Sequence, residues 1–387
     1  MLREIAGALG NELRSLEPHG PRGTTALSAA LSVALACLAA LILHSDEPWW
    51  AGVSAWMVTR SSLAVALSRG VMRIVGSAVG ASIAVIALGF FAYDPLLFCL
   101  CLFLIASTGL FGFAKSPYGY AWLIFAITAN LVMLMALDQP QTAFTIAVNR
   151  VADVAIGTAS ALLVTYLLPA LPDAPANPPA RARSALPLLC WSRRYAREFE
   201  GWLHENRPML LHAARGGLTV MVLPLLLNWL APLGSSTLAV TAVAVMAIPT
   251  TAILEPDART VVQRAVHRLV GCALGALLGL LCLYWVGGNF AVWLLLLMSG
   301  VWFNSQIQSG STGISYVGTQ AGLAFLLSMI QGQGPPLSPT PGLDRFAGIM
   351  AGLSVLLVIT MVISLFRLTA GPTAADARES TAEPATA

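Results

Sequence analysis

The sequence has little charge and almost no lysine. Only 10% of its 387 residues are charged and 57% are hydrophobic, whereas soluble domains carry about 25% charged residues. Its one lysine, Lys115, lacks the preceding glycine-rich turn that an ATP-binding P-loop needs. This scarcity excludes a soluble enzyme, a nucleic-acid-binding protein, a disordered scaffold and a P-loop ATPase. Because the mean hydropathy of +0.77 comes from long apolar runs, the composition predicts a polytopic membrane protein.

Residues that bind metals or form disulfides are also scarce. The chain has six cysteines and five histidines, and no cysteine forms a CxxC pair or pairs with a histidine at metal-ligand spacing. The histidines lie at the ends of apolar segments or between them, without an Asp or Glu constellation for catalysis. We therefore expect packing roles for the cysteines, and neither a metal, a cofactor nor an enzymatic activity.

Long apolar runs make up most of the chain. A membrane-spanning helix needs about 20 mostly apolar residues, and twelve segments approach that length. They lie at residues 24–44, 48–66, 70–92, 95–114, 118–137, 143–169, 211–231, 235–254, 265–286, 289–307, 313–331 and 344–367. The first begins behind a charged segment and has no signal-peptide cleavage site. The predicted fold class is all-α, with about 12 transmembrane helices.

An internal repeat divides these segments into two halves. Residues 68–81 (SRGVMRIVGSAVGA) and 263–276 (QRAVHRLVGCALGA) agree at eight of fourteen positions, at an offset of 195. The same offset places Arg150 on Arg345. Because each half has an even number of predicted spans, we expect two parallel six-helix repeats related by a pseudo-two-fold axis along the membrane normal.

The distribution of basic residues sets the orientation. With the N-terminus in the cytoplasm, 19 of the 21 basic residues lie on the cytoplasmic side, and both termini are cytoplasmic. The predicted units are a cytoplasmic N-terminal segment (1–23), the first repeat (24–169), a cytoplasmic linker (170–210), the second repeat (211–367) and a disordered tail (368–387). Apolar residues in the linker recur at the spacing of an amphipathic helix on the inner leaflet: Leu188, Trp191, Tyr195, Phe199 and Trp202.

Three stretches carry a resemblance to a known family. They are WWAGVSAWMVTRSSLAVALSRGVMRIVGSAVGA at 49–81, NRVADVAIGTASALLVTYLLP at 149–169, and QRAVHRLVGCALGALLGL in the second half. The sequence resembles the fusaric acid resistance or aromatic acid exporter family, and more distantly the plant aluminium-activated malate channels. The resemblance implies a multi-pass protein of the bacterial inner membrane that exports aromatic carboxylates or related toxic compounds.

This resemblance leaves three functional hypotheses open. The first is an efflux transporter for organic, aromatic carboxylate anions. The second is a passive anion channel on the same scaffold, and the third is a non-transporting membrane subunit of an efflux assembly. The expected partners are a small organic anion and the lipid bilayer, with a periplasmic adaptor protein as a further candidate and no nucleic acid.

Two arginines lie at the outer ends of spans, where basic residues are otherwise absent. Arg150 and Arg345 begin the last predicted helix of each half. One interpretation is an electropositive ring at the outer end of an anion pathway. The alternative is local pairing, because Asp153 lies one helical turn after Arg150 and Asp344 precedes Arg345.

On the inner side, arginines recur one helical turn apart. Arg73 and Arg268 follow Arg69 and Arg264, and each pair shares a helix face with two glycines, which allow close helix contact. For Arg73 and Arg268, deeper in the span, we favour binding of substrate carboxylates. For Arg69 and Arg264, we favour a topology signal.

Other residues could contact an aromatic substrate. Tyr120 and Tyr316 align at an offset of 196 and are candidates for an aromatic wall, although anchoring at the membrane interface is the commoner role. Asn130 lies inside a span and could bond a carboxylate or a neighbouring helix. Asp153 is the one acid well inside an apolar span, so it is the candidate for proton coupling. An anion leaving a negative interior needs no such coupling.

Overall fold

The computed structural model describes residues 2–60, 62–168, 195–230, 235–247, 259–332, 334–335 and 340–369. The first half contains α2 (Pro21–Ile42), α3 (Trp49–Val58), α4 (Leu63–Phe91), α5 (Pro95–Lys115), α6 (Gly119–Met135), the short helix η1 (Pro140–Thr142) and α7 (Ala143–Leu167). The second half contains α8 (Tyr195–Leu230), α9 (Ser235–Met246), α11 (Arg259–Val286), α12 (Phe290–Gln308), α13 (Ser315–Met329) and α14 (Thr340–Thr369). Helix α1 (Leu2–Arg14) precedes both halves. The described residues contain no β-strand, and the all-α fold class is confirmed.

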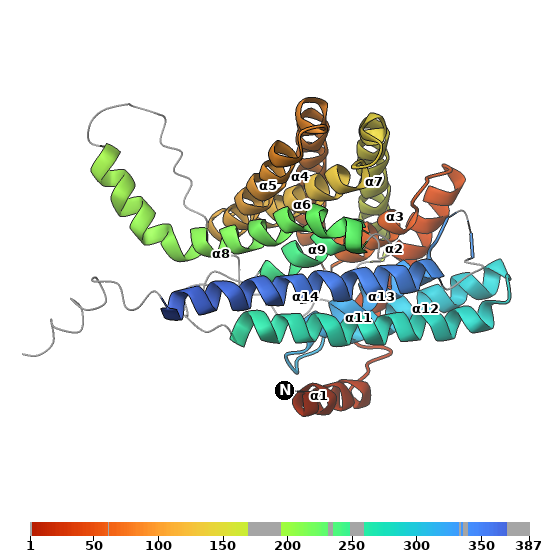
Figure 1. Ribbon diagram of the computed structural model, residues 1–387. Helices are drawn as coiled ribbons and strands as arrows, with labels where there is room; N and C mark the ends of the chain where they lie inside the picture. The colour runs from red at the N-terminus through yellow and green to blue at the C-terminus, as the bar shows by residue number, and fades with distance from the viewer. Residues whose placement is uncertain are drawn as a thin grey trace, which may run out of the picture.

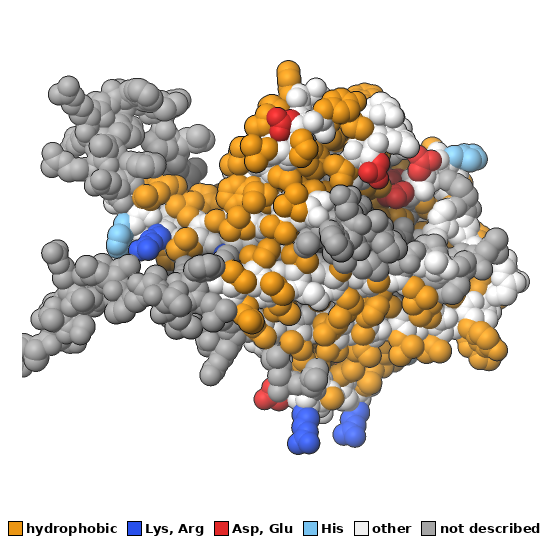
Figure 2. Space-filling view, viewed as in Figure 1, with side chains coloured by type: hydrophobic (Ala, Val, Ile, Leu, Met, Phe, Trp, Pro, Cys, Tyr) orange, Lys and Arg blue, Asp and Glu red, His pale blue; other side chains and the backbone are white. Residues whose placement is uncertain are grey.

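Seven helices are long and apolar enough to cross a membrane. They lie at Pro21–Ile42, Leu63–Phe91, Pro95–Lys115, Pro140–Leu167, Gly201–Leu225, Val262–Val286 and Phe290–Gln308. Each of the other predicted segments also contains a helix. Two of these contain shorter apolar stretches, Gly119–Met135 in α6 and Phe346–Val362 in the longer helix α14. Hydrophobic side chains cover most of the face seen in Figure 2, and charged side chains gather toward its edges. This surface is the one expected of a protein embedded in lipid.

The predicted span at 48–66 is wrong in its bounds. Helix α3 ends at Val58 after ten residues, so it is about 15 Å long, half the thickness of a hydrocarbon core. The backbone is extended at the caps Thr59 and Ser62, and α4 begins at Leu63. The polar run around Arg60 therefore marks a break between two helices, which an apolar average over the segment hides.

Residues 195–210 of the predicted linker are helical, but they do not form a helix of their own. These residues form the first part of α8, which continues into the span predicted at 211–231. Pro208 and Pro224 lie inside this 36-residue helix, and prolines at such positions kink a helix. The early part of α8 bends away from the bundle in Figure 1. Residues 169–194, which include Leu188 and Trp191, and the tail from residue 370 lie outside the described residues.

The long helix with the paired arginines packs in the same way in both halves. α4 packs against α6, and α11 packs against α13. A Cβ atom at Gly76 would lie 2.5 Å from the carbonyl oxygen of Ala121, and one at Gly271 would lie 2.5 Å from that of Val317. These glycines let the backbones approach closely, which confirms the helix contact predicted from their spacing.

The repeat extends to the helix caps. Asp94 accepts hydrogen bonds from two backbone N–H groups at the start of α5, at 3.0 and 3.1 Å. Asn289 lies at the repeat offset of 195 from Asp94, and it does the same for α12, at 3.0 and 3.2 Å. A side-chain oxygen at this position satisfies N–H groups that the helix leaves free, so local capping and repeat register agree.

Helices of each half pack against helices of the other half. α2 of the first half packs against α12 of the second, and the equivalent α8 packs against α5. α9 lies between α6 and α14. A two-fold relation between the halves would produce reciprocal contacts of this kind, α2 on α12 and α8 on α5. In Figure 1, α11 and α14 run across the view while α4 and α7 run up it, so an axis along one membrane normal stays a prediction.

The segment before each half forms a clasp onto the other half. In the first clasp, α1 packs on α12, and the buried Glu12 carboxylate accepts hydrogen bonds from Arg22 (2.7 Å) and the N–H of Thr312 (2.9 Å). In the second clasp, α8 packs on α5, and Glu205 lies 3.7 Å from Lys115. An offset of 193 relates Glu12 to Glu205, so the two clasps occupy equivalent positions.

Candidate functional site

Arg73 is the buried arginine of the first half. Its side chain is 4% exposed on α4, and it donates to Ser54 Oγ of α3 (3.1 Å) and to Tyr120 Oη of α6 (2.9 Å). Arg69, one turn earlier, lies over the ring of Tyr120 at 5.0 Å. The structure thus brings together Arg73 and Tyr120, two candidates from the sequence, in a contact between three helices.

Arg268 is its counterpart in the second half. It is also 4% exposed, and it donates to Gln320 Oε1 of α13 and to Thr241 Oγ1 of α9. Tyr316, the repeat-mate of Tyr120, does not bond Arg268: its ring lies 4.1 Å from the Arg264 guanidinium carbon. The first arginine of each pair therefore stacks on a tyrosine, a contact that stabilises a cation over an aromatic face.

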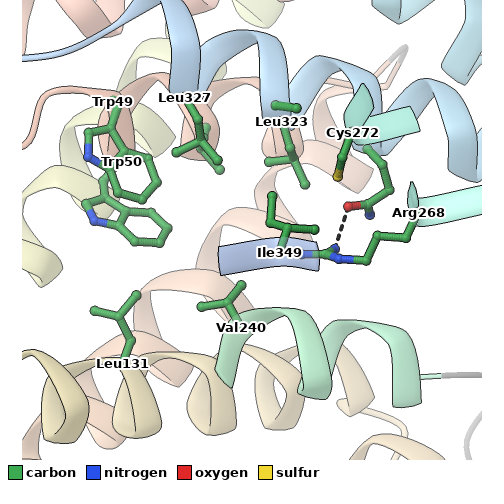
Figure 3. A pocket seen from close by; sticks show the side chains of 12 residues that line it. Trp49, Trp50, Leu131, Val240, Arg268, Cys272, Leu323, Leu327 and Ile349 are labelled. Carbon is green, nitrogen blue, oxygen red and sulfur yellow. Dashed lines mark hydrogen bonds between the residues drawn. The ribbon is translucent and has the colours of Figure 1, made fainter. Parts of the chain in front are cut away.

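Arg268 lines a small cavity between the halves, which we call the inner chamber. Its volume is about 60 Å³, and its walls come from α3, α6, α9, α11, α13 and α14. The lining residues are Trp49, Trp50, Val53, Leu131, Val240, Arg268, Cys272, Gln320, Leu323, Ala324, Leu327 and Ile349. Figure 3 shows the two indole rings at one end and Arg268 at the other. The Nε atom of Arg268 is buried without a hydrogen-bond partner, so the guanidinium retains a donor for a ligand.

A second cavity, which we call the outer cavity, holds Arg150. It has a volume of about 150 Å³ and lies among α3, α6 and α7 and the loop before α3. Arg150 is 4% exposed, and its guanidinium carbon lies 3.2 Å from the centre of the Trp50 ring. Its Nε and Nη1 atoms are buried without a hydrogen-bond partner. This cavity therefore also presents a cation with free donors.

Acidic residues surround Arg150 without forming a close ion pair with it. Asp46, Glu47 and Asp153 line the outer cavity, and Asp153 accepts a hydrogen bond of 2.6 Å from Ser45 Oγ. Ion pairs within 4.0 Å join Arg22 to Glu12 and Lys115 to Glu205, but none joins Arg150 to a carboxylate of the described residues. Arg150 thus contacts an aromatic face and not the carboxylate that the local-pair interpretation gave it.

The remaining candidates lie elsewhere. Asn130 is fully buried in α6, and its amide donates to the carbonyl of Ala126 one turn earlier, at 2.8 Å, while Oδ1 has no partner. The backbone of Arg345 lies in α14, and its side chain lies outside the described residues. Within the described ranges, no group of three or more His, Cys, Asp or Glu could hold a metal ion.

Sequence reasoning missed the two tryptophans that wall the inner chamber. Trp49 and Trp50 begin α3 and stack with ring centres 3.6 Å apart. They stood in the stretch that carried the family resemblance, but a tryptophan pair at the end of an apolar segment is typical of an interface anchor. The break after α3 could have identified them, because a helix of only ten residues is too short to place both of its ends at the membrane interfaces.

Comparisons with known proteins agree with the division into halves. Residues 24–186 match the model of the fusaric acid resistance protein family, and residues 225–359 match a model described as fusaric acid resistance protein-like. The two matches cover most of the chain, one in each half.

Two curated relatives also match. They are the proteins called uncharacterized transporter YdhK in Escherichia coli strain K12 and in Escherichia coli O157:H7, each 28% identical over 160 residues. The match covers 39% of this chain and 23% of each relative, so it spans less than a quarter of the relatives' length. No solved structure matches the chain. Its apolar helices and the two family matches lead to one conclusion: the chain is a multi-pass membrane protein that belongs to the fusaric acid resistance protein family.

Proposed function

We propose that this protein is a membrane transporter that exports organic anions, with aromatic carboxylates as the substrate class. The inner chamber carries the proposal, because it combines the indole walls of Trp49 and Trp50 with the free donor of Arg268. A guanidinium grips a carboxylate through paired hydrogen bonds, and an aromatic ring stacks on indole. The family match and the relative's name, uncharacterized transporter, support the same function.

The size of the chamber fits a closed state of such a transporter. A cavity of about 150 Å³ holds benzene, whereas the inner chamber has about 60 Å³. An aromatic acid therefore fits only after the surrounding helices move apart. Because both halves line the chamber, a rocking motion of one half against the other would change its volume, which is how many transporters alternate access.

We assign the candidate residues different roles within this function. Arg268 and Arg150 would contact the substrate carboxylate, because both have buried donors without partners. Arg73 and the tyrosines Tyr120 and Tyr316 would position the helices that carry the site, because they bond one another or the neighbouring arginines. Arg345 stays a candidate for the outer end of the path.

The topology proposed is two six-helix repeats in the bacterial inner membrane, with both termini in the cytoplasm. Helix α3 would occupy the second span of the first repeat, although its ten residues give only about 15 Å of helix, half the thickness of the hydrocarbon core. Periplasmic reporters fused after Asp46, Asp94, Asp138 and Gly288 should be active. Activity from a fusion at residue 200 would contradict this orientation.

The membrane potential suffices to drive export of an anion. Each negative charge that leaves a cell gains about 2.3 kcal/mol per 100 mV. Asp153 is the candidate for additional proton coupling, and Asp153→Asn should then abolish any dependence of export on the pH gradient. Export that depends on voltage alone should survive this substitution.

The test of the proposed function is transport by the full chain reconstituted in liposomes. Benzoate, its saturated analogue cyclohexanecarboxylate and its neutral analogue benzamide separate the contributions of ring and charge. We expect saturable, voltage-driven transport of benzoate, weaker transport of cyclohexanecarboxylate and no voltage-driven transport of the neutral benzamide. Arg268→Gln should raise the benzoate concentration that gives half-maximal transport. Arg3→Gln on the exposed face of α1 is the matched control. Absence of transport for all three compounds would overturn the proposal, and large non-saturating currents would favour an anion channel.

A further inference from the structure

The inner chamber and the outer cavity are separate spaces that share two residues. Trp50 and Leu131 line both of them. The chamber holds Arg268 on one side of these residues, and the outer cavity holds Arg150 on the other. Each arginine has a buried donor without a partner. Two sites that suit a carboxylate are therefore divided by the Trp50 indole and the Leu131 side chain.

Contacts on several sides fix the Trp50 ring in this position. The ring of Trp49 stacks on it with centres 3.6 Å apart, and the Arg150 guanidinium carbon lies 3.2 Å from its centre. Both distances are too short for the two groups to share one face, so they lie on opposite faces. The indole Nε1–H donates to Glu47 Oε2 at 2.7 Å. The ring cannot turn without breaking these contacts.

An aromatic anion that enters the path would weaken two of these contacts, the one with Arg150 and the one with Trp49. A carboxylate that reaches Arg150 competes with the Trp50 ring for the guanidinium, since a charge-assisted hydrogen bond is stronger than a cation–π contact. An aromatic substrate can also replace Trp49 on the face of Trp50. Arrival of a suitable anion thus weakens the contacts that fix the ring.

We propose that Trp50, with Leu131, is the septum between the inner chamber and the outer cavity, and that its contacts with Glu47 and Arg150 hold it closed. The barrier itself follows from the two cavities alone. Its role in selecting aromatic anions rests on the proposed function. The septum would pass an anion only when the ring turns aside, so the protein would not conduct freely in this conformation.

Cys272 provides a direct readout because it lines the inner chamber and is 1% exposed. In a full-length variant with Cys272 as the single cysteine, a membrane-impermeant thiosulfonate reagent is added from the face that carries Asp46 and Glu47. Trp50→Ala should raise the rate of Cys272 labelling at least about tenfold. Trp285→Ala, at an indole that is 73% exposed on α11, is the matched control and should label as slowly as the parent.

Two further variants keep the test decisive if Trp50→Ala does not fold. Leu131→Ala removes the other shared residue, and Glu47→Gln weakens the contact with the indole N–H; both should raise labelling, the second by less. Equal labelling of the parent and these variants, slow or fast, would overturn the septum. If labelling rises as expected while the parent transports no aromatic acid, the septum stands and the proposed function falls. If the parent transports an aromatic acid but none of the variants changes the labelling rate, the proposed function stands and the septum falls.

Discussion

Arg73 and Arg268 occupy equivalent positions in the two repeats, yet their surroundings differ. Both are buried and both bond a hydroxyl on an earlier helix of the same half, Ser54 on α3 or Thr241 on α9. Arg73 has no buried atom without a partner and lines neither cavity, whereas Arg268 has a free Nε and lines the inner chamber. The duplicated pattern thus sets a common framework, and the residues opposite the arginine decide which copy faces a cavity.

The largest expected effect concerns the helix contact beneath each arginine. Gly275→Ala should destabilise the protein more than Gly80→Ala, because a new Cβ at Gly275 would overlap the carbonyl oxygen of Ala321, while one at Gly80 would lie 2.6 Å from that of Phe125. Overpacking of this kind costs about 1–3 kcal/mol, and more where backbone must move. The measurement is thermal stability of the purified protein in detergent.

The control for these variants is Gly89→Ala, also in a long helix, where a Cβ would meet nothing within 4 Å. It should be neutral or slightly stabilising, because alanine favours helix more than glycine does. Equal destabilisation at all three glycines would contradict the role of the close contact, because Gly89 has no such contact and helix propensity alone would stabilise each alanine variant.

The second prediction separates binding from structure at the arginines. Arg268→Gln should raise the substrate concentration for half-maximal transport about five- to a hundred-fold, since it removes one charged hydrogen bond worth about 1–3 kcal/mol. Arg73→Gln should instead lower thermal stability, because Ser54 and Tyr120 lose their partner. Arg268→Lys should restore transport only in part. The comparison fails if both glutamine variants change transport and stability alike.

The third prediction concerns the first clasp. Burial alone would raise the pKa of Glu12, but hydrogen bonds from Thr312 and Arg22 and the charge of Arg22 lower it below its ordinary value. Ionised Glu12 therefore stabilises docking of α1 above the ordinary value of 4.5, and this contribution is lost as the pH falls through the lower pKa of the folded state. Acid should thus make the link between α1 and α2 more sensitive to protease.

Glu12→Gln should weaken this dependence on pH and expose the link already at neutral pH. The reason is that a neutral amide cannot accept a charge-assisted hydrogen bond from Arg22, which also donates to the carbonyl of Gln306 at 2.7 Å. Protease sensitivity that is the same in the variant and the parent at every pH would show that Glu12 does not hold the clasp.

The smallest expected effect belongs to the second clasp. Glu205 is 74% exposed and lies 3.7 Å from Lys115, and exposed ion pairs of this kind contribute at most about 1 kcal/mol. Glu205→Gln should therefore leave thermal stability nearly unchanged, and any effect should vanish at high salt. If Glu205→Gln lowered thermal stability as much as Glu12→Gln does in the same measurement, the two clasps would be equivalent in strength as well as in position.

Much of the helical order could be predicted from the sequence. Apolar runs located a helix in every predicted segment, because burying or lipid-exposing apolar residues requires an internally bonded backbone. The pattern could not show that α3 ends at Val58 or that α8 begins before the predicted span. Polar interruptions such as Thr59 and Arg60 fit an interface as well as a break, and only contacts with neighbouring helices distinguish the two.

The candidate site was predicted only in part. Arg268 stood out because a charge deep in an apolar span needs a reason, and it does line a cavity. Trp49 and Trp50 did not stand out, because their side chains reach the chamber through the short length of α3. The local pairing of Arg150 with Asp153 followed from helical spacing, yet the Trp50 ring from another helix takes that place.

The sequence by itself determined the membrane character, the helices and the repeat, since these depend on composition and on patterns within a short stretch of chain. The tertiary structure alone decided which arginine keeps a free donor, which aromatic rings wall a cavity and where Trp50 divides two spaces. These features depend on side chains from helices far apart in the chain, such as α3, α7 and α11. Their meeting is set by packing between the halves, which no local pattern encodes.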